Sequence, residues 1–179
     1  MSQLSPRTRR FANALRWACY AAILMMLTFA FYALFTPGFV VEQAAHQLFA
    51  SDVTWQVGVL ERAGLLLLGA VALLAVIFTL VQTAFLFETY ARGEAISPAA
   101  ALTIRRIGFG LLAQAAIGFF GTTLAGLLLS IGAPEGKRML VISIGTSEIG
   151  FALAGGLMML IGIVMLQAVE AVRENREFV

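Results

Sequence analysis

The sequence predicts an all-α integral membrane protein built as a four-transmembrane-helix bundle. Four long stretches carry no charged residue, at positions 17–41, 63–87, 107–134 and 149–169. An α-helix rises about 1.5 Å per residue, so roughly 20 apolar residues cross a hydrocarbon core about 30 Å thick. Only 12% of the residues are charged and 60% are hydrophobic, whereas about a quarter of the residues in a soluble domain are charged. We therefore expect spans at approximately 13–35, 61–87, 106–131 and 148–169 within one membrane domain, 1–179.

Length and composition exclude several classes of protein. Four spans and their connections use up nearly all 179 residues, which leaves no room for a separate soluble catalytic or nucleic-acid-binding domain. The net charge of +2 comes from residues spread around the predicted helix ends, where basic side chains set topology, so direct nucleic-acid binding is not expected. Cys19 is the only cysteine, so no intrachain disulfide forms.

The distribution of basic residues orients the chain. Cytoplasmic loops of membrane proteins are enriched in Lys and Arg. With the N-terminus inside, nine of the twelve basic residues lie on the cytoplasmic side and three lie outside. The inner group is Arg7, Arg9, Arg10, Arg16, Arg92, Arg105, Arg106, Arg173 and Arg176, and the outer group is Arg62, Lys137 and Arg138. We expect an N-in, C-in topology.

The first exterior segment begins where Pro37 and Gly38 end the first helix. The pattern of residues 39–49 suits a short helix lying on the outer interface. Within it, Glu42 and His46 are spaced i, i+4, with Asp52 nearby. These scattered ligands, with one histidine in the chain, favour a solvated face over a metal or haem site.

The connection between the second and third spans predicts a protruding cytoplasmic hairpin. Gly93 can adopt the left-handed conformation that ends a helix. Ser97 supplies an N-cap oxygen and Pro98 a preset φ for the first residue of the third helix. The short link makes these two helices antiparallel neighbours.

Small and polar residues repeat every four positions along the third span. Such residues let helix backbones approach closely. Because this spacing drifts by about 40° per step on a 3.6-residue helix, we expect the stripe to meet two neighbouring helices or to cross one neighbour right-handedly. Its members are Gly110, Gln114, Gly118, Thr122, Gly126 and Ser130. Matching small or polar residues are Ala72, Ala75, Thr79, Gln82 and Thr83 on the second span, and Ala152, Gly155, Met159 and Gly162 on the fourth.

Three residues are candidates for intramembrane polar contacts: Gln82, Gln114 and Glu148. In an antiparallel hairpin Gln82 and Gln114 come to similar depths, so we expect them to pair; a polar gate is the alternative. Glu148 is interpreted as a carboxylate in the first turn of the fourth helix, stabilised by the helix dipole. A coupling or ligand-binding role remains open if it lies at membrane depth.

Three parts of the chain carry a family resemblance: segment 90–98, the run Ile104, Arg105, Arg106, Ile107, Gly108, and the charged tail 167–179. In these parts the chain resembles a bacterial family of four-helix membrane proteins, catalogued as domain of unknown function 2975. Residues 99–101 depart from the polar residues usual after the serine. The resemblance implies a bacterial inner-membrane location and a membrane partner that holds or modulates a cytoplasmic regulator.

Two functional interpretations follow. The first is a non-enzymatic interaction or regulatory protein, or an accessory subunit of a membrane complex, since no catalytic motif, metal site or cofactor site is present. The second is a small oligomeric solute or ion transporter. The candidate partner-binding residues are Tyr90, Arg92, Glu94, Arg105 and Arg106 on the hairpin and Glu170, Arg173, Glu174 and Arg176 on the tail. Alternatively, these arginines only set topology and bind lipid phosphates. A homo-oligomer is the other partner considered.

Overall fold

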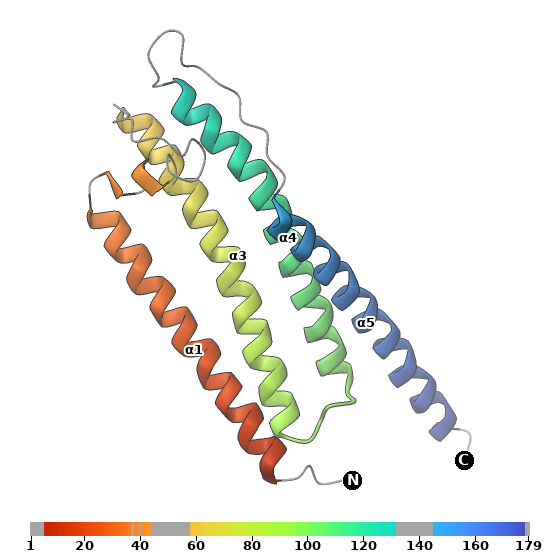
Figure 1. The fold of residues 1–179 in the computed structure, drawn as a ribbon. Coiled ribbons are helices and arrows are strands. Elements are labelled where there is room, and N and C mark those ends of the chain that lie inside the picture. Colours follow the sequence, from red (N-terminus) through yellow and green to blue (C-terminus); the bar gives the residue numbers. More distant parts are fainter. Residues whose placement is uncertain (1–5, 37, 40, 44–57, 132–144, 178–179) are drawn as a thin grey trace.

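Four long helices make up most of the part of the chain that the structure describes (Figure 1). The computed structural model describes residues 6–36, 38–39, 41–43, 58–131 and 145–177. The helices are α1 (Pro6–Phe35), α3 (Val59–Ala91), α4 (Pro98–Ile131) and α5 (Thr146–Glu177). All four are long and apolar enough to cross a membrane, and no strand occurs among the described residues. The prediction of an all-α protein with four candidate spans is confirmed.

The helices are longer than the predicted spans, mainly at one end of the molecule. This end, called the hairpin end below, comprises the start of α1, the turn at residues 92–97 and the end of α5 (Figure 1). The opposite end contains the described residues that follow α1, which belong to the segment predicted to be exterior. There Phe39 and residues 41–43 are helical, and the rest of the predicted interfacial helix, residues 40 and 44–49, lies outside the described residues.

The helices pack in chain order, α1 on α3, α3 on α4 and α4 on α5. Other pairs of described helices make at most marginal contact. In Figure 1, α1, α3 and α4 lie side by side while α5 crosses α4 and diverges from it. The helices thus pack against one another, as the prediction of a bundle implies. They form an open row, however, because the first and last helices of the row do not close on each other. A consequence is that α1 and α5 each pack mainly on one neighbour.

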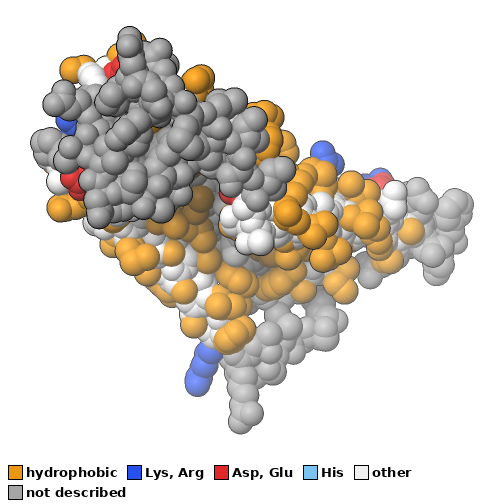
Figure 2. Space-filling view, turned by 45° about the horizontal axis from the view of Figure 1, so that its top comes forward, with side chains coloured by type: hydrophobic (Ala, Val, Ile, Leu, Met, Phe, Trp, Pro, Cys, Tyr) orange, Lys and Arg blue, Asp and Glu red, His pale blue; other side chains and the backbone are white. Residues whose placement is uncertain are grey.

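Apolar side chains cover the outside of the row. At most 11% of the residues in any candidate spanning window are buried. Large hydrophobic residues such as Leu67, Phe120 and Leu153 are about 70% exposed, at 67%, 67% and 71%. In Figure 2, hydrophobic side chains dominate the visible middle of the described surface, and most charged side chains in view lie toward its margins. Such an outer surface suits lipid rather than water as the surrounding solvent.

The turn between α3 and α4 has the predicted left-handed glycine and the predicted helix caps. Gly93 has a φ of +84°, and its N–H donates to the carbonyl of Tyr90 at 3.0 Å. The N–H of Glu94 donates to the carbonyl of Thr89 at 3.1 Å, which completes a Schellman-type helix end. Ser97 Oγ accepts the N–H of Ala100 at 3.1 Å, so the predicted N-cap ahead of Pro98 is confirmed.

Glycines allow the backbones of α4 and α5 to touch. A Cβ placed on Gly155 would lie 2.8 Å from the backbone nitrogen of Leu112 and 2.9 Å from the carbonyl oxygen of Gly108. A Cβ on Gly162 would lie 2.8 Å from the backbone nitrogen of Arg105. These separations leave no room for a side chain, so the seam between α4 and α5 depends on glycine.

The stripe of small residues on α4 meets two helices, which is the first of the two arrangements expected from its spacing. Gly110 lies against Phe78 and Thr79 of α3. Two steps further along α4, Gly118 lies against Glu148 of α5. The change of neighbour follows from the drift of about 40° per four residues.

Candidate functional site

Exposed charges of the hairpin and of α5 lie at the same end of the molecule. Glu94, Arg105 and Arg106 are exposed, while Tyr90 is half-buried. Arg105 lies where Gly162 of α5 approaches α4. From that point α5 continues toward its C-terminal end, which lies at the hairpin end (Figure 1). The close packing of α4 on α5 therefore holds both groups of predicted partner-binding residues at one end of the molecule.

The tail of α5 is helical through its charged residues. Glu170 and Arg173 form an ion pair at 3.1 Å across one helical turn, with side chains 58% and 69% exposed. Such an exposed pair contributes little to stability, about 0.3–0.5 kcal/mol. The helix extends to Glu177, while the side chains of Glu174 and Arg176 lie outside those that the structure describes.

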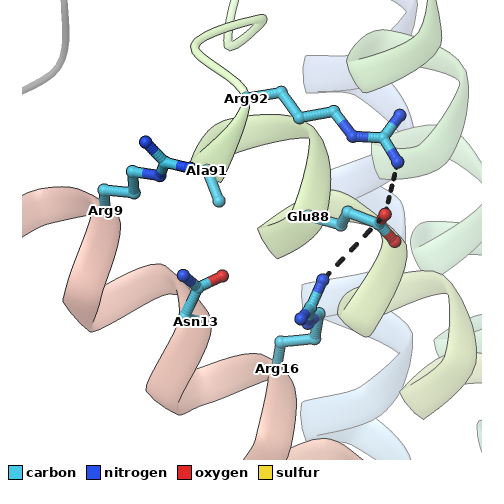
Figure 3. A pocket seen from close by; sticks show the side chains of 6 residues that line it. All are labelled: Arg9, Asn13, Arg16, Glu88, Ala91 and Arg92. Atoms are coloured by element: carbon cyan, nitrogen blue, oxygen red, sulfur yellow. Dashed lines mark hydrogen bonds and ion pairs between the residues drawn. The ribbon is translucent and has the colours of Figure 1, made fainter.

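Arg92 belongs to a cluster of polar side chains between α1 and α3. The sequence analysis did not predict that these residues lie together. Glu88 Oε1 accepts a hydrogen bond from Arg92 one turn away and lies 3.9 Å from Arg16 Nη1 of α1. Arg9 and Asn13 of α1 line the same hollow (Figure 3). The spacing of Arg9, Asn13 and Arg16, i, i+4 and i+7, was the available signal that they share a helix face.

Gln114 has a different partner from the one expected. Its Nε2 donates to Thr79 Oγ1 at 2.8 Å, and the Thr79 hydroxyl donates to the carbonyl of Ala75 at 2.9 Å. No hydrogen bond between Gln82 and Gln114 occurs among the described interactions. The reason is register, since Thr79 lies about one turn from Gln82 on α3 and is the residue against which Gly110 packs. Gln114 thus makes a polar contact between two candidate membrane spans, but its partner is the hydroxyl of Thr79 and not the amide of Gln82.

Glu148 lies against the middle of α4. A Cβ placed on Gly118 would be 3.0 Å from Glu148 Oε1 and 3.1 Å from its Cγ. Gly118 is twelve positions after Arg106 on α4, which corresponds to about 18 Å along the helix axis. Glu148 is half-buried, and one carboxylate oxygen accepts a hydrogen bond from Ser147 Oγ at 3.1 Å. A carboxylate therefore lies beside the central part of an apolar helix.

Metal-ligating side chains do not gather in the part of the chain that the structure describes. Within those residues no group of three His, Cys, Asp or Glu side chains is placed to hold an ion. His46 and Asp52, considered with Glu42 above, lie outside the described residues.

Comparisons with protein-family models, curated proteins and solved structures found no match to this chain. The resemblance of the hairpin and tail to a bacterial membrane family therefore remains an expectation. Any function has to be argued from the geometry.

Proposed function

We propose that this chain is a non-enzymatic, multi-pass protein of the bacterial inner membrane that acts as an interaction or regulatory partner. Its partner would be a cytoplasmic regulator or another subunit of a membrane complex. The observation that carries the proposal is the grouping of exposed charges at the hairpin end, where Glu94, Arg105 and Arg106 share one end of the molecule with Glu170 and Arg173. Arranged charges of both signs favour selective protein contacts.

The same end is proposed to be cytoplasmic. Nine of the twelve basic residues belong to α1, the turn, the first turns of α4 or the end of α5. The positive-inside rule supports this orientation, in which both termini and the turn face the cytoplasm.

Matched charge reversals test the partner surface. Glu94 and Glu42 are both exposed carboxylates, but they belong to opposite ends of the row. We expect Glu94→Lys, and more strongly the triple reversal of Glu94, Glu170 and Glu174 to Lys, to reduce co-purification of the partner from native membranes. Glu42→Lys is the control and should leave it unchanged. If every protein that co-purifies with the native chain also co-purifies with the triple variant, and the variant keeps its topology, these residues do not form the partner-binding surface.

The reversal also separates a protein partner from lipid attraction. Replacing acids by lysines makes the hairpin end more basic, which strengthens its attraction to anionic lipid. A complementary protein interface is instead damaged by the same change. Loss of co-purification without loss of membrane insertion therefore indicates a protein interface.

A small oligomeric solute or ion transporter is the second candidate, and Glu148 favours it. Ionisable residues at membrane depth commonly mark ion or proton pathways, and this carboxylate lies beside Gly118 in the middle of α4. Proteoliposomes with an internal pH indicator provide the test. A proton flux present in the native chain and abolished by Glu148→Gln would support transport. Equal fluxes in the native chain, Glu148→Gln and empty liposomes would contradict proton transport through this residue.

A further inference from the structure

A polar hollow lies between α1 and α3 at the hairpin end (Figure 3). Its volume is about 440 Å³, and it is lined by Arg9, Asn13, Arg16, Glu88, Ala91 and Arg92. In Figure 3 the two arginines nearest Glu88 point toward it from opposite sides, while Arg9 and the Asn13 amide lie beside the remaining space. The hollow is large enough to admit a small polar group with its hydration.

The lining has an excess of positive charge. The guanidinium groups of Arg9, Arg16 and Arg92 line the hollow together with one carboxylate, that of Glu88, which gives a formal charge of +2. Glu88 is shared by Arg16 and Arg92, whereas Arg9 forms no ion pair among the described residues. The Nε of Arg16 is buried and donates to no described acceptor. Because that nitrogen has no exposed surface, a ligand cannot reach it, and the excess of guanidinium groups is what favours an anionic ligand with several acceptor oxygens.

The hollow lies where the apolar stretches of both helices end. Trp17 begins the uncharged stretch of α1 and Glu88 directly follows that of α3. Trp17 is 65% exposed, and the Arg16 guanidinium carbon lies 6.0 Å from the centroid of its ring. Tryptophan at such a position is typical of the membrane interface, so the hollow lies at the depth of lipid headgroups.

We propose that this hollow binds a phosphate group, supplied by an anionic phospholipid headgroup of the adjacent leaflet or by a soluble phosphate compound. Arginine matches phosphate well because its planar guanidinium donates two parallel hydrogen bonds. Arg9 and the Asn13 amide supply the donors, while Glu88 holds Arg16 and Arg92 in place.

Binding to the protein in maltoside micelles, which contain no phosphate, tests the proposal. Native mass spectrometry measures occupancy by dioleoylphosphatidylglycerol for the native chain, Arg9→Gln, Arg9→Lys and Arg106→Gln. Arg106 is the matched control because it is an exposed arginine of the same end that does not line the hollow. Circular dichroism checks that each variant is folded, and Arg9→Gln leaves both ion pairs of Glu88 in place.

We expect Arg9→Gln to weaken phosphatidylglycerol binding about tenfold or more, the effect of losing a hydrogen bond between a cation and a phosphate oxygen inside the hollow. Arg9→Lys should recover part of the loss, and Arg106→Gln should change binding by less than about twofold. Competition by inorganic phosphate at constant ionic strength would identify a soluble phosphate as the ligand, and its absence would identify the lipid. Equal losses in Arg9→Gln and Arg106→Gln, or equal binding of dioleoylglycerol, which has no phosphate, would overturn the proposal.

Discussion

Replacing Gly155 by alanine should loosen the packing of α5 on α4. The new Cβ would lie 2.8 Å from the backbone nitrogen of Leu112 and 2.9 Å from the carbonyl oxygen of Gly108. Non-bonded heavy atoms are most favourably separated by about 3.5–4.0 Å, and backbone atoms of a helix cannot rotate away. The two helices must therefore separate, which weakens contacts along the whole seam.

The adjacent residue provides a matched control. Gly156 has no heavy atom within 4 Å of an added Cβ, so the same substitution there adds a methyl group in open space. Overpacking typically costs about 1–3 kcal/mol, whereas alanine in place of glycine in a helix interior gains up to about 1 kcal/mol. The difference between the two variants should be about 2 kcal/mol, roughly a 30-fold change in the folded-to-unfolded ratio.

Unfolding in mixed micelles of maltoside and dodecyl sulfate, followed by circular dichroism, measures both free energies. A second readout is the separation of labels on α4 and α5, which should increase in Gly155→Ala alone. Equal unfolding free energies for Gly155→Ala and Gly156→Ala would show that the backbone contact seen between the helices is not present in the folded protein.

Two further substitutions test polar and turn contacts by the same unfolding assay. Thr79→Val removes the hydroxyl that accepts the hydrogen bond of Gln114 and should lower the free energy of unfolding by about 0.6–2 kcal/mol. Thr79→Ser keeps a hydroxyl and should recover most of that loss. Identical stabilities of the Val and Ser variants would argue against the hydrogen bond. Gly93→Ala places a Cβ on a residue with a φ of +84° and should cost about 1–2 kcal/mol. Gly69→Ala, in open space on α3, should show no loss, and equal effects of the two would contradict the turn geometry.

Local signals in the sequence were sufficient for the helices and the turn. The uncharged stretches predicted the four helices, and Gly93, Ser97 and Pro98 predicted where α3 ends and α4 begins, because caps depend on the residues next to them in the chain. The four-residue repeat on α4 limited the stripe to two arrangements, contact with two neighbours or a right-handed crossing of one, because both follow from helix geometry, and the structure has the first.

Contacts that depend on the register of one helix along another could not be predicted from local signals. Gln114 was expected to meet Gln82, but it bonds to Thr79, because side-chain packing around Gly110 sets the register. Hydropathy likewise predicts the start of α5 to within two residues, but neither its end at Glu177 nor its depth beside α4. The contact of Glu148 with Gly118 therefore emerged only from the fold. The cluster around Glu88 needs the register of α1 on α3, which no local pattern contains.

Cysteine labelling from each side of the membrane decides whether the hairpin end is cytoplasmic. In a Cys19→Ala background, Glu94→Cys and Gln47→Cys are treated with a membrane-impermeant maleimide in spheroplasts and in inside-out vesicles. The proposed topology predicts labelling of Glu94→Cys only in inside-out vesicles and of Gln47→Cys only in spheroplasts, since nine of twelve basic residues belong to the hairpin end. Reversed labelling, or labelling of both positions from the same side, would contradict it.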